Sequence, residues 1–314
     1  MVQRYWSAVF NESFFASNLA KRPMTTLSTS PVDLKRLQLR TRRLVATALH
    51  GGYRTAFRGS GLVFSDIRPY EPGDDGKRIH WAATARSGTP LVKSYEEDRH
   101  LSMMLLMDTS PSVQLGEGMA GFTRARTFGE LVINLASVHR DSVGLCQCGP
   151  EVLDYRKPAS SRAHRHLLIS NLAEPQQSVS TSSDLRPGLQ AILKHQKRPG
   201  VVFVVSDFFV PEFEESLRQI THRHDTICVQ LRHPFFLDVP SAGIVAFRDV
   251  ESGEAVLIDT YSAASRRAIE SALTNHHRRL AELCGRCRAD LITVDTDPVG
   301  SFLSFLRSRT ARIR

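Results

Sequence analysis

Residues 101–112 read LSMMLLMDTSPS, an apolar run that ends in a carboxylate and hydroxyl groups. The run predicts a buried strand, and the Ser and Pro residues after it predict a turn. Asp108, Ser110 and Ser112 alternate in this turn, so a DxSxS pattern follows the strand. A strand of an open α/β sheet delivers the side chains after its carboxyl end into the crevice where such sheets bind ligands.

The DxSxS pattern predicts a metal site. Asp108, Ser110 and Ser112 offer three hard oxygen ligands, which suit Mg²⁺, or Mn²⁺ in its place. Asp207 comes soon after another apolar run, residues 201–205. If the two strands are neighbours, Asp207 lies near Asp108 and contributes directly or through a water. A plain turn is the competing interpretation, because Ser, Asp and Pro are common turn residues, but the second carboxylate favours the metal.

The composition indicates a globular protein without a membrane span. The chain has 314 residues, 41% of them hydrophobic, and its longest apolar runs are residues 101–107, 131–138 and 201–205. A membrane helix needs about 20 apolar residues. Residues 1–24 lack the continuous apolar core of a secretory signal. The five cysteines are an odd and sparse set, which fits reduced thiols, so we expect a cytoplasmic protein.

The chain divides into three parts by composition. Residues 1–32 are expected to form a poorly ordered leader. Residues 33–99 contain a basic amphipathic helix, residues 33–49, and a segment rich in Gly, Pro and charge that we expect to pack on the core. Residues 100–314 alternate β-like and helical stretches, which predicts an α/β domain with a doubly wound, mostly parallel sheet.

The expected elements follow from these patterns. Strands are expected over residues 91–95, 101–107, 141–148, 201–206, 225–231 and 290–294, helices over residues 123–140, 184–196, 212–222, 262–284 and 299–309, and a hairpin attached to the sheet over residues 243–249 and 254–259.

Two further patterns resemble metal sites. Cys284 and Cys287 have CxxC spacing, but no second CxxC is present, so a structural role at the end of a helix is favoured over zinc or redox chemistry. Paired histidines in arginine-rich helices are expected to be solvated surface, and they are His164, His166, His222, His224, His276 and His277.

A second set of residues resembles a known bacterial family, the domain of unknown function 58 family. The matching motifs are GSGLVF at residues 59–64, IRPYEPGDD at 67–75, RIHW at 78–81, AR at 85–86, LVKSYEE at 91–97, the hairpin at 249–259 and DTD at 295–297. The resemblance covers about residues 33–314. The DxSxS pattern with a later Asp is also similar to the metal-ion-dependent adhesion site of von Willebrand factor A domains.

The resemblance implies a von Willebrand A-like domain without established catalysis. It also implies a MoxR-type AAA+ ATPase as partner, with which the domain acts as a chaperone or maturation adaptor for a client protein. Family members often have amino-terminal membrane helices, which this sequence lacks, so it resembles the shorter, soluble kind. In adhesion-type sites a Thr from another loop completes the coordination, and in the Ser/Thr-rich run 178–183 we expect Thr181. A Glu or Asp of the partner would take the open position on the ion.

The signature segment has two interpretations. One is a docking surface for the ATPase, and the other is an internal ion-pair network that holds an irregular segment in place. Trp81 is expected to be a buried anchor, although Trp is also favoured at interfaces. The candidate partner-binding residues are Arg68, Tyr70, Asp74, Asp75, Arg78, Trp81 and Arg86.

Two other functions compete with protein binding. The net charge of +9, with basic clusters at both ends of the chain, would suit a nucleic-acid-binding protein, but a solvated basic face is the more common meaning. A metal-dependent hydrolase would need a general base, which the sequence does not place beside the predicted site. We therefore expect a non-enzymatic, metal-dependent protein-binding adaptor, with nucleic acid an unlikely partner.

Overall fold

The computed structural model describes residues 63–76, 79–96, 101–114, 120–174, 183–232, 241, 243–248 and 255–313. They belong to two compact units, one over Arg58–Leu101 and the other formed by the rest of the chain. The helix expected over residues 33–49 lies outside the described residues. Within the described ranges, no helix combines the length and the apolar character needed to cross a membrane.

The larger unit is built on one mixed sheet. Its strands are β3 (Ser102–Asp108), β4 (Ser142–Cys148), β5 (Val152–Ala159), β6 (Val201–Ser206), β7 (Asp225–Leu231) and β10 (Asp290–Val294). They lie in the order β10-β7-β6-β3-β4-β5, and every pair is parallel except β4 with β5. The chain begins in the middle of this sheet with β3, moves outward through β4 to β5, and then returns to β6 and moves outward to β10 on the other side. This is the strand order of a doubly wound fold. The predicted α/β fold class with a mostly parallel sheet is confirmed.

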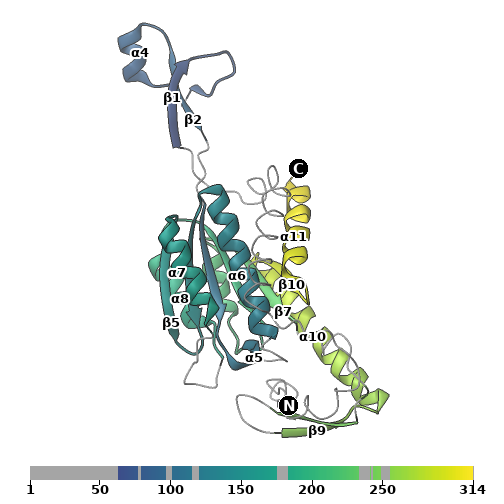
Figure 1. The fold of residues 1–314 in the computed structure, drawn as a ribbon. Coiled ribbons are helices and arrows are strands. Elements are labelled where there is room, and N and C mark those ends of the chain that lie inside the picture. Colours follow the sequence, from purple (N-terminus) through teal and green to yellow (C-terminus); the bar gives the residue numbers. More distant parts are fainter. Residues whose placement is uncertain are drawn as a thin grey trace. The chain divides into compact units, whose positions relative to one another are not determined.

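Helices cover both faces of this sheet (Figure 1). One face carries α6 (Ala120–His139), α7 (Arg162–Ala173) and α11 (Pro298–Ile313), and the other carries α8 (Arg186–His195), α9 (Glu214–Thr221) and α10 (Ala263–Cys287). The short helix α5 (Pro111–Gln114) follows β3 directly.

The central strands are buried on both faces. Met104 and Leu106 of β3 join the core cluster formed with α8, α9 and α10. On the other face, Phe203 of β6 meets Phe128 and Phe302 edge to face, with ring centroids 5.9 and 6.0 Å away. A strand covered by helices on both sides needs apolar residues at every position, which is why β3 and β6 are continuous apolar runs without alternation.

Two elements of the larger unit had no signal in the sequence. The edge strand β5 has exposed side chains at Arg156 and Lys157 and a Pro at 158, residues that keep an edge from pairing further. Helix α7 follows it. The hairpin is confirmed as antiparallel strands β8 (Ile244–Arg248) and β9 (Ala255–Asp259). Its expected attachment to the main sheet was wrong, because among the described strands β8 and β9 form a separate two-stranded sheet.

The smaller unit is an antiparallel pair with a short helix. Strand β1 (Val63–Pro69) pairs with β2 (Leu91–Glu96), the strand that the sequence predicted. Helix α4 (Trp81–Ser87) lies between them in sequence. The ring of His80 caps the start of α4 by accepting from Ala83 N, and Gly88 ends it in the left-handed conformation at φ +72°.

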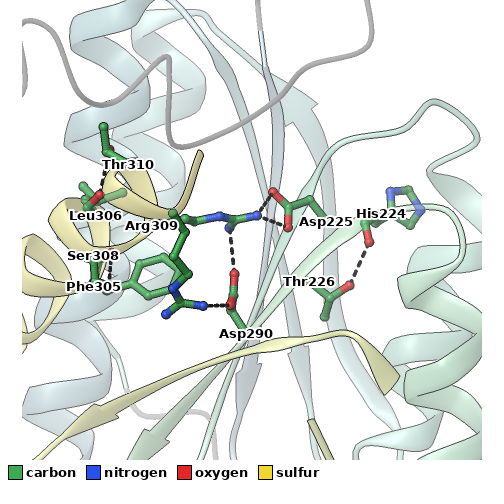
Figure 2. Close-up of polar contacts among 10 residues, drawn as sticks. His224, Asp225, Thr226, Asp290, Phe305, Leu306, Ser308, Arg309 and Thr310 are labelled. Atoms are coloured by element: carbon green, nitrogen blue, oxygen red, sulfur yellow. Dashed lines mark hydrogen bonds and ion pairs between the residues drawn. The ribbon is translucent and has the colours of Figure 1, made fainter. Parts of the chain in front are cut away.

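The last helix is fixed to the amino-terminal edge of the sheet (Figure 2). Arg309 of α11 donates to both carboxylate oxygens of Asp225 at 2.6 and 2.7 Å and lies 3.4 Å from Asp290. These acids are the first residues of β7 and β10. The guanidinium also lies 5.7 Å from the ring centre of Phe305, so it stabilises both the strands and its own helix.

Replacing Arg309 by Met tests this clamp. The change leaves the partly buried carboxylate of Asp225 without its cation, while Asp290 keeps Arg312, so the free energy of unfolding should fall by roughly 2–3 kcal/mol in urea titrations. Arg312 is the matched control, since it contacts Asp290 at 3.4 Å with a side chain that is 66% exposed. Arg312→Met should cost about 0.5 kcal/mol or less. Equal losses in the two variants would show that Arg309 contributes no more than a surface charge.

The histidine beside this clamp predicts a pH dependence. His224 is 3% exposed, and burial, with the charge of Arg223, lowers its pKa to about 4. Between its ordinary pKa of about 6.5 and this value, the unfolded chain binds a proton that the folded protein does not. Stability should therefore fall as the pH drops through this window. Urea unfolding at several pH values should show a smaller fall for His224→Gln, and identical profiles would contradict the assignment.

Candidate functional site

Asp108 is a buried carboxylate at the carboxyl end of β3. It is 5% exposed. Its Oδ1 accepts from Ser110 N at 2.8 Å, and its Oδ2 accepts from the Ser206 hydroxyl at 2.6 Å. Burial raises the pKa of Asp108, while the hydrogen bonds from Ser206 and Ser110 lower it. No ion pair joins this carboxylate to a cation within the described part of the chain.

The expected neighbour relation of the two strands is confirmed. β3 and β6 run in parallel register up to Met107 and Val205, so Asp108 lies opposite Ser206. The hydroxyl that contacts Asp108 therefore comes from the residue before the predicted Asp207. Ser206 was not predicted, because a serine that ends an apolar strand carries no signal until its neighbouring strand is known.

Ser110 and Ser112 are spaced as two ligands of one ion would be. Their hydroxyl oxygens are 3.1 Å apart and form a hydrogen bond to each other. Adjacent ligands of octahedral Mg²⁺, at about 2.1 Å from the ion, are about 3.0 Å apart. Together with the buried carboxylate of Asp108, these hydroxyls fit a small hard cation.

Asp207 lies in a tight turn after β6. Its Oδ1 accepts from Phe209 N at 3.0 Å, and its carbonyl accepts from His276 Nε2 at 3.2 Å. Phe208 adopts a left-handed conformation at φ +61°, which is uncommon for an aromatic residue and often marks a functional turn. Phe208 N donates to the Ser206 hydroxyl at 2.8 Å, so this turn also orients the donor to Asp108.

The structure adds a candidate for the remaining hydroxyl. Thr181 lies outside the described residues. Ser183, from the same run, is 2% exposed, and its hydroxyl has no hydrogen-bond partner in the described part of the chain. The next residue, Asp184, accepts at its carbonyl from the Cys148 thiol, and Cys148 is paired with Asp108 in the sheet. A buried hydroxyl without a partner is costly, which makes Ser183 a ligand candidate.

The signature segment contains the internal ion pair that one interpretation expected. Arg68 donates to both oxygens of Asp74 at 2.8 and 2.5 Å, and Asp74 also accepts from Glu71 N at 2.9 Å. The other predicted partner-binding residues are placed as follows: Tyr70 is 39% exposed, Asp75 and Arg86 are exposed, and Arg78 lies outside the described residues.

The expectation that Trp81 is a buried anchor was wrong. Trp81 is the first residue of α4 and is 70% exposed, and no residue of this helix is buried. The short helix is stabilised by its caps, from His80 and Gly88, so the tryptophan is not needed to hold it. An exposed Trp is a frequent anchor in protein interfaces.

The structure fits the structural role expected for the two cysteines but not the solvated surface expected for most of the histidines. Cys284 and Cys287 are buried and free, in the core with Cys228, and burial raises the pKa of Cys287, which fits a structural role. The expectation of solvated surface was wrong for four histidines, since His224 is buried and His164, His276 and His277 are half-buried and hydrogen-bonded, whereas His166 and His222 are exposed. Among the described residues, no three His, Cys, Asp or Glu side chains form a metal cluster.

Comparisons with known proteins identify a family. The family model described as "Protein of unknown function DUF58" matches residues 66–279. An uncharacterised protein of Mycobacterium tuberculosis is 27% identical over 281 residues, which are 88% of each chain. A second, from Mycobacterium avium, is 27% identical over 159 residues, which are 49% of this chain and 94% of that one.

Matches to solved structures have TM-scores below 0.5. An aerotolerance-related membrane protein of Bacteroides fragilis has a TM-score of 0.45 and 12% identity, over 68% of this chain and 99% of that one. The conserved hypothetical protein BatB of Bacteroides thetaiotaomicron has a TM-score of 0.43 and 10% identity, over 67% and 98%. The VWA domain of SpRpn10 has a TM-score of 0.34 and 12% identity, over 67% and 95%.

A double-mutant cycle tests the bond between Ser206 and Asp108. Ser206→Ala removes the donor to Asp108 and the acceptor of Phe208 N, so the free energy of unfolding should fall by about 1–3 kcal/mol. In an Asp108→Asn background the same change should cost less, because the charge-assisted bond is already lost. Urea unfolding of the four proteins gives the coupling. Additive losses would show that the two side chains do not interact.

Proposed function

Because the chain belongs to the DUF58 family of proteins of unknown function, we propose that it is a non-enzymatic adaptor that binds another protein through a divalent metal ion at Asp108. Four points support this proposal: the buried carboxylate, the spacing of the two hydroxyls, the strained turn beside them and the exposed aromatic residue of the signature segment.

The observation that carries the proposal is the buried Asp108 carboxylate, which has no cationic partner among the described residues. Removing a charged carboxylate from water costs several kcal/mol unless a cation or several donors compensate it. Asp108 accepts from the Ser206 hydroxyl and from Ser110, and these donors carry no charge. A divalent ion would supply the missing positive charge, and its binding would stabilise the folded protein.

The residues that would hold the ion form a set of hard oxygens. Asp108, Ser110 and Ser112 would contribute ligands, Asp207 would act directly or through a water, and Ser183 or Thr181 would complete the set. Mg²⁺, or Mn²⁺, prefers such ligands and keeps open positions for other molecules. The bound ion would supply a positive point to which a Glu or Asp of a partner protein can coordinate, and this would make docking depend on the metal.

The partner in this proposal is a MoxR-type AAA+ ATPase, with which the protein would mature a client. The signature segment offers a second contact surface, because Trp81 and Tyr70 are exposed there at 70% and 39%. Arg68 and Asp74 are occupied by their own ion pair, so in this surface the aromatic side chains would contribute most of the binding energy.

A binding assay with the MoxR-type ATPase of the same organism tests the proposal. We expect the wild-type protein to retain the ATPase in Mg²⁺ and to lose it in a chelator. Asp108→Ala should lose it under both conditions, because the carboxylate that would hold the ion is absent. Glu270→Ala is the matched control, since it removes an exposed carboxylate on α10. Trp81→Ala should weaken binding by about 30-fold.

Two outcomes would contradict the proposal. Equal retention in Mg²⁺ and in chelator would show that the partner docks elsewhere and that the DxSxS turn is structural. Binding to DNA or RNA that survives Asp108→Ala and falls steeply with salt would indicate a nucleic-acid-binding protein, because counterion release from phosphates does not involve this carboxylate.

A further inference from the structure

His276 connects the long helix α10 to the turn that carries Asp207. It lies near the middle of α10, far from β6 in sequence. Its Nε2 donates to the Asp207 carbonyl at 3.2 Å. Its ring stacks on Phe209, with centroids 4.0 Å apart and planes at 13°. One side chain therefore contacts two residues of the same turn through two different interactions.

The turn that His276 contacts orients both carboxylates of the candidate site. The Ser206 hydroxyl accepts from Phe208 N and donates to Asp108 Oδ2. Phe209 N donates to Asp207 Oδ1. Each bond depends on the backbone conformation of residues 206–209, and Phe208 holds a left-handed φ of +61° there. A non-glycine residue in this region costs about 1–2 kcal/mol, so the turn persists only if its surroundings hold it.

Helix α10 provides a rigid base for His276. On the carboxyl-terminal side, Leu280 and Cys284 are buried in the core cluster with Cys228 of β7. The next residue, His277, donates through Nδ1 to Gln230 Oε1 at 2.7 Å, which fixes the same turn of helix to β7. The position of His276 is therefore set by the sheet and not by the turn that it contacts.

We propose that His276 is a positioning residue for the metal site, an inference that rests on the proposed function. Its stack on Phe209 and its bond to the Asp207 carbonyl hold the strained turn in the conformation in which Asp207 and Ser206 serve the ion. The stack on Phe209 needs an aromatic ring, and the bond to the Asp207 carbonyl needs an N–H donor on that ring. Phe would keep the ring without the donor, and Gln would keep a donor without the ring.

Mn²⁺ affinity measured by electron paramagnetic resonance on the full chain tests this inference. His276→Ala should weaken Mn²⁺ binding by about tenfold, the effect typical of residues that orient metal ligands. His276→Phe and His276→Gln should each lose part of this affinity. His222→Ala is the matched control, because it removes an exposed histidine at the end of α9 that contacts neither the turn nor its support, and its Mn²⁺ affinity should stay within about twofold of wild type.

A double-mutant cycle separates positioning from general stability. If His276 acts through Asp207, His276→Ala should cost no further Mn²⁺ affinity in an Asp207→Asn background. Thermal unfolding identifies variants that do not fold. If His276→Ala is one of these, a loss of affinity in either His276→Phe or His276→Gln supports the inference.

The outcomes distinguish this inference from the proposed function. Wild-type protein that binds no Mn²⁺ would contradict the metal site itself. Wild-type protein that binds Mn²⁺ through Asp108, as shown by its loss in Asp108→Ala, would uphold the site. In that case, wild-type affinity in every folded His276 variant would overturn the positioning role alone.

Discussion

The buried carboxylate of Asp108 is the constraint on which the site depends. The doubly wound sheet places it at the carboxyl end of a central strand, where helices on both faces exclude water. A charge in such a place must be compensated, and Ser110 and the Ser206 hydroxyl supply hydrogen bonds to it. The turn with the left-handed Phe208 orients the Ser206 donor, and His276 stacks on Phe209 of the same turn.

Stability and the candidate site use opposite edges of the same sheet. At the amino-terminal edge, Arg309 joins the last helix to the first residues of β7 and β10 through a satisfied ion pair. At the carboxyl edge, the donors to Asp108 among the described residues are neutral. The carboxylates paired with Arg309 stabilise the fold and have little remaining charge for a ligand. A buried acid that lacks a cationic partner favours the binding of a cation.

The sequence predicted what local patterns encode. The continuous apolar runs of β3 and β6 identify the buried strands, and the DxSxS turn identifies Asp108, Ser110 and Ser112, because these residues are close in the chain. Ser206 and His276 were missed because their roles arise from pairing between distant segments. Strand β5 was missed because an edge strand with Arg, Lys and Pro lacks an apolar pattern. Trp81 was misjudged because the apolar character of a Trp predicts burial, whereas α4 is too short and too exposed to bury it.

Crystals grown in Mn²⁺ would test the central claim most directly, through anomalous scattering from the metal. If Asp108 is part of a metal site, an anomalous peak should lie about 2.2 Å from the hydroxyl oxygens of Ser110 and Ser112. Asp108 should then lie within direct or water-mediated reach of the ion. An ordered DxSxS turn without a peak, at Mn²⁺ concentrations that saturate ordinary magnesium sites, would show that Ser110 N and Ser206 alone compensate the carboxylate and that the turn is structural.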